Sequence, residues 1–314
     1  MDADRRTADE RPITPKEALE YAQHLCAAAG SETPRLDGEV LLRHVLGIDR
    51  AGLYGRMTEP LTSTQAAAFL TLLGRRVAGE PVAYLTGFKE FMGLGFAVGP
   101  GVLIPRPETE LLVEWALAWL NERPRTTVVD VGVGSGAIAL SIAALTPPDA
   151  EVEVIGIDAS SSALTWAQRN RRGLGLDARV VLLEGDLTTG LADASADLVL
   201  SNLPYLTPQQ VVENPWLAME PAEALIGGAD GMDFVHRLID DVPRVLRPGG
   251  AVGIEIDPSQ AEAAQRLLAA APFRLTSSHT DRRSNRRRTR EPARSSRQAP
   301  CCSRAPPTRA QTHA

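Results

Sequence analysis

The tetrapeptide Asn202-Leu203-Pro204-Tyr205 follows residues 196–200, an apolar run with the composition of a buried strand. The Asn202 side-chain oxygen and the Leu203 carbonyl could both accept hydrogen bonds from one NH2 group, while Tyr205 packs against a planar substrate. This arrangement suits transfer to a weakly nucleophilic planar nitrogen, such as a carboxamide or the exocyclic amine of a base. Asn and Pro are also ordinary turn residues, so the tetrapeptide alone does not separate a site from a turn.

A glycine-rich segment follows a second apolar strand pattern, residues 127–131. It consists of Gly132, Val133, Gly134, Ser135 and Gly136, and a helical apolar pattern comes after it. Glycines at alternate positions let the backbone pass close to a ligand at a helix N-terminus. The segment therefore predicts a nucleoside-binding loop.

Acidic residues lie at the ends of three successive expected strands. Asp158 comes 22 residues after Gly136, a distance at which a carboxylate can accept from both ribose hydroxyls. Asp130 suits a cationic amino-acid end better than a diphosphate, and the third glycine comes too early for a dinucleotide fingerprint. We therefore predict S-adenosylmethionine as the ligand, with Asp186 accepting from the adenine amine and Leu187 covering the ring. Asn202, after the fourth strand, completes this predicted cofactor site.

The composition indicates a globular protein without a membrane span. The 314 residues are 44% hydrophobic, enough to fill a core. Three cysteines, Cys26, Cys301 and Cys302, are too few and wrongly spaced for a disulfide framework or a zinc site, so we expect no metal. No apolar run reaches 18 residues, and the N-terminus lacks the apolar core of a signal peptide. We expect a cytoplasmic protein.

The net charge of −6 conceals an asymmetry. Residues 274–314 contain 11 arginines and two acidic residues, whereas the rest carries 22 basic and 37 acidic residues, a net charge of −15. An acidic body argues against a nucleic-acid platform, because phosphate contacts supply most of that affinity. Direct nucleic-acid binding is therefore expected only through the basic tail, if at all.

Residues 1–78 predict a helical domain and residues 79–105 a β-hairpin linker. Helices are expected after the Thr14-Pro15 cap, from near Pro34 to Gly47, and after the cap at 62–64. This module is either a plain folding unit or a platform that holds a macromolecular substrate. From residue 79 the pattern becomes a glycine-punctuated alternation that includes Val82, Tyr84 and Leu85, which is typical of a hairpin.

Residues 106–273 predict an α/β domain, and residues 274–314 a basic tail. The segment 101–110 leads into this domain, where Arg106 and Glu108 either form an ion pair at a helix start or line the cofactor mouth. The tail lacks apolar periodicity, so we expect it to be disordered. It is either a genuine basic arm or a C-terminus altered by a shifted reading frame, and the composition favours the second.

Together, segment 101–110 (Gly-Val-Leu-Ile-Pro-Arg-Pro-Glu-Thr-Glu), the 130–136 loop, the tetrapeptide, and segments 220–225 and 227–231 resemble the HemK/PrmC family of protein-(glutamine-N5) methyltransferases. The resemblance covers residues 14–273. It implies a Rossmann-like class I methyltransferase domain after a small helical domain, with S-adenosylmethionine as donor. It also implies that the acceptor is the glutamine of the Gly-Gly-Gln motif in class 1 peptide chain release factors.

The sequence departs from this family at two places. The family usually carries Asn-Pro-Pro-Tyr, whereas Leu203 stands second here, and Asn-Leu-Pro-Tyr also resembles the ribosomal-RNA adenine N(6)-methyltransferases. Family members usually end with two further strands that close the sheet, which the composition of 274–314 does not predict, so we expect an exposed sheet edge. An adenine methyltransferase and an inactive methyltransferase-like scaffold remain as alternatives.

Overall fold

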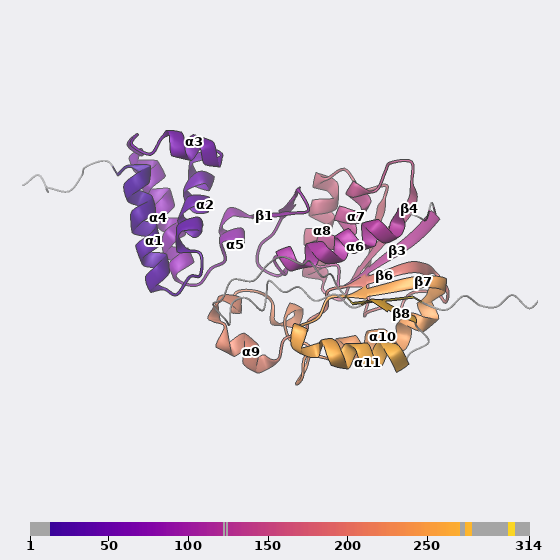
Figure 1. The fold of residues 1–314 in the computed structure, drawn as a ribbon. Helices are drawn as coiled ribbons and strands as arrows, with labels where there is room; N and C mark the ends of the chain where they lie inside the picture. The colour runs from indigo at the N-terminus through magenta and orange to yellow at the C-terminus, as the bar shows by residue number, and fades with distance from the viewer. Residues whose placement is uncertain (1–12, 122, 124, 271–273, 278–300, 305–314) are drawn as a thin grey trace, which may run out of the picture. The chain divides into compact units, whose positions relative to one another are not determined.

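The computed structural model describes residues 13–121, 123, 125–270, 274–277 and 301–304. The chain divides into two compact units, the first ending at Gly87 and the second beginning at Phe88 (Figure 1). The first unit is helical, and the second is built on a mostly parallel sheet.

The helices of the first unit bury one apolar core. They are α1 (Pro15–Ala28), α2 (Pro34–Leu46), α3 (Arg50–Gly55), α4 (Ser63–Val77) and α5 (Val82–Thr86). Thr14 and Thr62 close capping boxes at the starts of α1 and α4, and Gly47 ends α2 in the left-handed conformation. The core includes Leu42 and Phe69, which are buried. The three helices expected from the sequence are therefore present.

The prediction that Val82, Tyr84 and Leu85 lie in a strand is wrong. These residues belong to α5, which Gly87 terminates with a φ of 67°. Leu85 packs into the core of the helical unit, so tertiary burial overrides the local alternation. The hairpin is correspondingly shorter than predicted.

The second unit begins with that hairpin, β1 (Phe88–Phe91) paired antiparallel to β2 (Leu94–Ala97). Its further strands are β3 (Arg125–Val131), β4 (Glu151–Asp158), β5 (Val180–Glu184), β6 (Ala196–Ser201), β7 (Leu246–Ile254), β8 (Arg274–Ser277) and β9 (Cys301–Arg304). Its α-helices are α6 (Glu110–Leu120), α7 (Ala137–Leu145), α8 (Ser161–Gly173), α9 (Pro208–Glu213), α10 (Asp233–Val245) and α11 (Ala261–Ala270). Short 3-10 turns are η1 (Pro107–Thr109), η2 (Pro215–Leu217), η3 (Ala222–Ala224) and η4 (Pro258–Gln260).

The main sheet has the strand order β5-β4-β3-β6-β7-β9-β8. Strands β3 to β7 are parallel, and the strand order reverses between β3 and β6. Val128 of β3 packs with α6, α7 and α8, whereas Val129 and Val131 pack with α10 and α11, so the central strand is buried on both faces (Figure 1). The carboxyl ends of the parallel strands therefore meet beside the reversal, where ligands bind in such sheets.

The prediction that the main sheet lacks its two closing strands is wrong. Strand β9 pairs antiparallel with β7, and β8 pairs antiparallel with β9, so β7 is not the edge of the sheet. Strand pairing uses backbone groups, and an arginine-rich segment can supply these as well as an apolar one. Residues 278–300 and 305–314, which hold most of the expected basic tail, lie outside the described residues.

Substitutions at two helical glycines should shift stability in opposite directions. A Cβ at Gly38 of α2 would lie 2.9 Å from the Ala22 Cβ of α1, whereas one at Gly74 of α4 meets nothing within 4 Å. We expect Gly38→Val to destabilise the helical unit by about 1–3 kcal/mol through overpacking. Gly74→Ala should stabilise it by about 0.5–1 kcal/mol through helix propensity. Calorimetry of the full chain measures both, and equal shifts would contradict close packing of α1 on α2.

Candidate functional site

A cavity of about 500 Å³ lies where β3, β4, β5 and β6 end. Its lining includes Asp158, the last residue of β4, and residues that directly follow the other three strands, namely Gly132, Gly185, Asp186, Asn202 and Leu203. This is the ligand-binding edge of a sheet with this topology. The volume lies within the usual range for small-molecule sites, about 300–1,000 Å³.

The glycine loop has a backbone that side chains would disturb. Gly132 and Gly136 have φ values of 79° and 87°, and a Cβ at these positions would lie 3.0 Å from Leu203 and 2.7 Å from Leu140 respectively. Gly132 and Gly134 line the cavity. Both positions allow the backbone to approach a ligand closely.

Other residues of the loop support it from behind. Val133 is buried in the core, and the Ser135 carbonyl accepts a hydrogen bond from Asn170 Nδ2 at 2.8 Å. Neither residue is part of the cavity lining, and the same holds for Gly136. These three residues thus help to shape the loop, and their contact with the cofactor stays a prediction.

Asp158 ties the end of β4 to the glycine loop. Its Oδ2 accepts from the Gly134 N–H at 2.8 Å, and its Oδ1 accepts from the Ser160 N–H at 2.9 Å. Burial raises the pKa of Asp158, and these two hydrogen bonds lower it in part. The carboxylate also lines the cavity, so it can accept further hydrogen bonds from a ligand.

Asp130 does not face the cavity as the sequence suggested. It is fully buried, and its Oδ2 accepts from the Ala139 N–H of α7 at 3.0 Å. Its Oδ1 is buried without a hydrogen-bond partner. Burial raises the pKa of Asp130 to about 8, with a further contribution from Asp158. The expected direct contact with a cationic ligand end therefore needs correction, because the carboxyl supports the loop from inside the domain.

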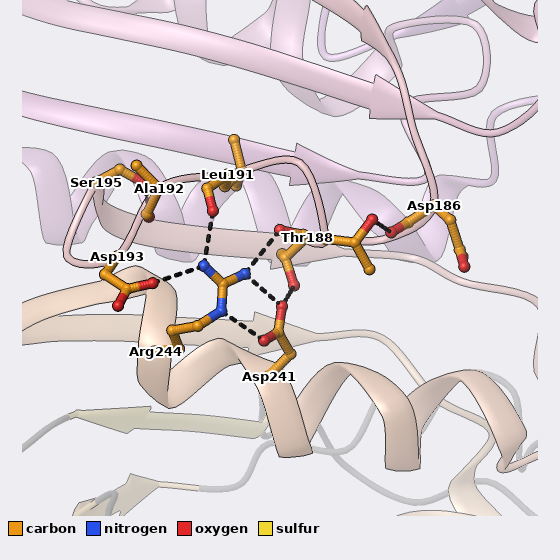
Figure 2. A network of polar contacts seen from close by, with 9 residues as sticks. Asp186, Thr188, Leu191, Ala192, Asp193, Ser195, Asp241 and Arg244 are labelled. Carbon is orange, nitrogen blue, oxygen red and sulfur yellow. Dashed lines mark hydrogen bonds and ion pairs between the residues drawn. The ribbon is translucent and has the colours of Figure 1, made fainter.

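The segment after β5 is held by a polar network around Arg244 of α10 (Figure 2). The guanidinium donates to the backbone carbonyls of Thr188 and Leu191 and pairs with Asp193 and Asp241. This network fixes the loop that begins at Leu187, a cavity residue with a φ of 52°. Leu187 therefore lines the cavity, and its contact with an adenine ring stays a prediction.

Asp186 also lines the cavity, and its carboxylate pairs with Arg237 of α10. The side chain of Asp186 is 55% exposed. It can thus meet a ligand at the cavity mouth while its charge is compensated.

The tetrapeptide after β6 enters the cavity through Asn202, Leu203 and Pro204. Leu203 is buried against Gly132. Tyr205 lies outside the cavity lining, and Gln260 Nε2 donates to its backbone carbonyl at 2.8 Å. Burial, with the nearby Glu255 charge, raises the pKa of Tyr205 well above its usual range, so its phenol stays neutral.

The ion pair considered between Arg106 and Glu108 is replaced by another. Arg106 pairs with Glu220, whose Oε2 also accepts from the Ile104 N–H at 3.0 Å. Two of the segments that carried the family resemblance, 101–110 and 220–225, are thus joined by an ion pair and a backbone hydrogen bond. Sequence reasoning placed both segments in the family but did not pair them.

Several cavity residues were not expected from the sequence. They are Gly101, Val102, Leu103, residues 159–163, Pro221, Glu223, Ala224 and Phe234. The strand-end rule does not find them, because they come from other elements: residues 161–163 begin α8, Phe234 lies in α10, and residues 222–224 form η3. The signals available were the position of 101–103 in segment 101–110 and that of Pro221, Glu223 and Ala224 in segment 220–225, both of which carry the family resemblance.

Two further observations concern the described residues alone. No cluster of three or more His, Cys, Asp or Glu side chains there is arranged to hold a metal ion. In the same part of the chain, none of the helices has the length and apolarity that a membrane crossing requires. A second hollow of about 620 Å³ contains Thr126, Thr127 and Arg247, at the amino ends of the parallel strands and away from the site.

Comparisons with known proteins cover both units. Residues 17–87 match the PrmC N-terminal domain, and residues 122–285 match a methyltransferase domain. The release factor glutamine methyltransferase of Moorella thermoacetica is 42% identical over 259 residues, covering 82% of this chain and 90% of that protein. The chain belongs to the release factor glutamine methyltransferase family.

Other members of this family are equally similar. The Bordetella pertussis protein is 44% identical, covering 79% of this chain and 91% of that protein, and the Rhodopirellula baltica protein is 39% identical, covering 83% and 90%. Family membership confirms the predicted fold class and a methyltransferase that uses S-adenosylmethionine. It supports neither the adenine methyltransferase nor the inactive scaffold.

The stability of the cofactor-free protein should depend on Asp130. Its folded-state pKa of about 8 exceeds the ordinary 3.8, so the folded state holds a proton that the unfolded state releases. The contribution of the protonated Asp130 carboxyl to the free energy of unfolding is fully present below pH 4 and is lost as the pH rises through about 8. We expect Asp130→Asn to become increasingly stable relative to the wild type from pH 5 to pH 9 in thermal melts. A difference that does not change with pH would contradict the buried, protonated carboxyl.

Gly227→Ala should displace the tetrapeptide. A Cβ there would lie 2.3 Å from the Pro204 carbonyl oxygen and 2.7 Å from that of Gly231. We expect a loss of about 1–3 kcal/mol of stability and a fall in methyl transfer, because the Pro204 backbone must move. Gly173→Ala, whose Cβ meets nothing within 4 Å, is the matched control and should retain activity. Unchanged transfer by the Gly227→Ala variant would show that this backbone position is not required.

Proposed function

We propose that this chain methylates the side-chain amide nitrogen of the glutamine in the Gly-Gly-Gln motif of class 1 peptide chain release factors. The observation that carries the proposal is that Asn202, Leu203 and Pro204 enter the same cavity as the glycine loop and Asp158. The names of the similar proteins support the same substrate class. This substrate places the reaction in the cytoplasm, where release factors act.

The residues around the cavity fit S-adenosylmethionine. Gly132 and Gly134 leave space for close backbone approach, and Asp158 can accept from the ribose hydroxyls. Asp186 and Leu187 also line the cavity, and in this proposal Asp186 accepts from the adenine amine and Leu187 covers the ring. Val133, Ser135, Gly136 and Asp130 would act by shaping the loop. The bound cofactor supplies a methyl group on a positively charged sulfur.

The acceptor is positioned by the tetrapeptide. The Asn202 side-chain oxygen and the Leu203 carbonyl accept from the two N–H groups of the glutamine amide, which fixes the nitrogen in the cavity. Pro204 limits the backbone freedom of Leu203, and Tyr205 follows as the neutral aromatic residue. No side chain has to act as a nucleophile, and the amide proton can leave to solvent after transfer.

The helical unit is the proposed platform for the protein substrate. The described part of the chain apart from β8 and β9 is acidic, which favours a protein acceptor over RNA. Four large apolar side chains of this unit, Tyr21, Leu36, Tyr54 and Leu70, are exposed. Apolar residues of this kind can contact a release factor.

Methyl transfer from labelled S-adenosylmethionine to a purified release factor tests the proposal. The factor with Gly-Gly-Ala in place of Gly-Gly-Gln and purified ribosomal RNA serve as parallel substrates. Label on the intact factor and not on the substituted one is the expected result. Label on RNA alone would overturn the proposed substrate.

Two variants should separate acceptor positioning from cofactor binding. Asn202→Ala should lower methyl transfer by roughly 100-fold, because misplacing the amide costs about this factor. Asp158→Ala should weaken cofactor affinity roughly 10-fold or more, since hydrogen bonds to a charged group contribute about 1.5–3 kcal/mol. Calorimetric titration with the cofactor measures the second effect. Full transfer by the Asn202→Ala variant would contradict the assigned role.

A further inference from the structure

One buried side chain of α8 connects two walls of the cavity. Asn170 is 4% exposed, and its Nδ2 donates to the Ser135 carbonyl of the glycine loop at 2.8 Å. The same side chain bonds both backbone groups of Ala97. Its Nδ2 donates to the Ala97 carbonyl at 3.0 Å, and its Oδ1 accepts from the Ala97 N–H at 2.7 Å. Ala97 ends β2 and begins residues 97–103, the strap.

The strap packs closely on α8 and ends in the cavity wall. Trp166 Nε1 donates to the Pro100 carbonyl at 3.2 Å. A Cβ at Gly99 would lie 2.6 Å from the Trp166 ring, and one at Gly101 would lie 2.3 Å from a side-chain oxygen of α8. The last three residues of the strap line the cavity, namely Gly101, Val102 and Leu103.

Hydrogen-bond chemistry fixes the orientation of the Asn170 amide. Its nitrogen donates to two carbonyls, and its oxygen accepts from an N–H. A flipped amide would place NH2 against N–H and oxygen against two oxygens, and neither arrangement can bond. The amide thus has one orientation that serves the strap and the glycine loop together.

The bond to Ser135 restrains the part of the loop with the most backbone freedom. Ser135 lies between Gly134 and Gly136, which have φ values of 54° and 87° and can adopt many others. The peptide that joins Ser135 to Gly136 is held at both polar groups. Its carbonyl accepts from Asn170, and its N–H donates to the Val133 carbonyl at 2.8 Å. Loss of the Asn170 amide would remove one of these two restraints.

We propose that Asn170 is a positioning residue that couples the strap to the glycine loop, so that S-adenosylmethionine meets two cavity walls already in place. The inference rests on the proposed cofactor site. Asn170 is not part of the cavity lining, so it acts through the backbone groups that it bonds. Without it, the cofactor would have to order both walls on binding, and the cost of that ordering would weaken its affinity.

Asn170→Ser tests this coupling. The shorter side chain has one hydrogen to donate and cannot serve two carbonyls, so cofactor affinity should fall roughly 10-fold. The KM for the cofactor should rise by a similar factor, while kcat at saturating cofactor stays within about twofold of wild type. Calorimetric titration, at a temperature where both proteins are folded, measures the affinity. A lower melting temperature with wild-type affinity would show a purely structural role and overturn the proposal.

Gln168→Ala is the matched control. It removes an exposed side-chain amide from the same helix and should change neither affinity nor kcat. An equal loss of affinity in this control would mean that any change in α8 weakens binding, and would also overturn the role assigned to Asn170.

A double-mutant cycle separates coupling from support of the glycine loop alone. Trp166→Phe removes the hydrogen bond to Pro100 and loosens only the strap, so affinity should fall roughly threefold. Because Asn170→Ser already frees the strap, the two losses should combine to less than their product. Losses that multiply would mean that Asn170 acts without the strap, which would overturn the coupling.

Hydrogen exchange in the wild type gives a test that does not depend on the folding of a variant. Ala97 lies outside the cavity lining, and its N–H donates to Asn170. Saturating cofactor should slow exchange of this amide roughly 10-fold, because ordering of the loop is transmitted to the strap. Exchange at Gly93, whose N–H bonds Glu90 within the hairpin, should not change. An Ala97 rate that is the same with and without cofactor would contradict the coupling.

The two proposals fail in different ways. A wild type that binds no S-adenosylmethionine would overturn the proposed cofactor site. A wild type that binds it, with an Asn170→Ser variant of equal affinity, would overturn the coupling alone.

Discussion

The loop between β3 and α7 has to pass the ends of two neighbouring strands without side chains in its way. Asp158 holds it from the β4 side through the Gly134 N–H, and Leu203 packs against Gly132 from the β6 side. Because both neighbours contact the loop, the position of the tetrapeptide depends on the glycines. The close packing around these glycines lets the loop backbone approach a ligand. The same packing also fixes the position of Asn202, at the start of the tetrapeptide. One sterically constrained loop thus connects the cofactor side of the cavity to the acceptor side.

Three carboxyl groups near this loop are kept in surroundings that disfavour their charge. Burial raises the pKa of Asp130, Asp158 and Glu255, and the backbone N–H groups from which Asp130 and Asp158 accept hydrogen bonds offset only part of the desolvation. Such groups weaken the folded state as the pH rises, because the unfolded chain ionises more easily. These carboxyl groups lie beside the glycine loop and Asn202. Their positions indicate that the protein loses some folding stability where the loop backbone and the Asn202 amide must be held in place.

The sequence predicted the elements whose signals are local and repeated. Buried strands, the glycine loop and the carboxylates at strand ends could be placed because parallel strands end at one edge. The orientation of the Asp130 side chain could not be predicted, since a strand residue just before a loop can point toward the ligand or toward the following helix. The prediction for the segment that forms α5 was wrong for a related reason. The alternation of Val82, Tyr84 and Leu85 is so short that packing into the core overrides it.

Contacts between distant segments were beyond sequence reasoning altogether. Thr109 and Asn202 are 93 positions apart in the chain, and only the folded domain brings the Thr109 hydroxyl to 3.0 Å from the Asn202 amide nitrogen. The pairing of Arg106 with Glu220 is of the same kind. The closing strands β8 and β9 escaped prediction because backbone pairing needs no apolar pattern. In each case the missing information was tertiary geometry.

Leu203 shows how this geometry can replace a local restraint. The family usually has proline at this position, where the ring restricts the backbone directly. Leu203 lacks that restriction, but its side chain is buried against Gly132, and Pro204 still disfavours the helical conformation for it. The Gly132 contact is available because no Cβ occupies the space. The glycine loop therefore supplies, through packing, part of the rigidity that a proline would supply through its covalent ring, and Leu203 keeps its place in the cavity lining.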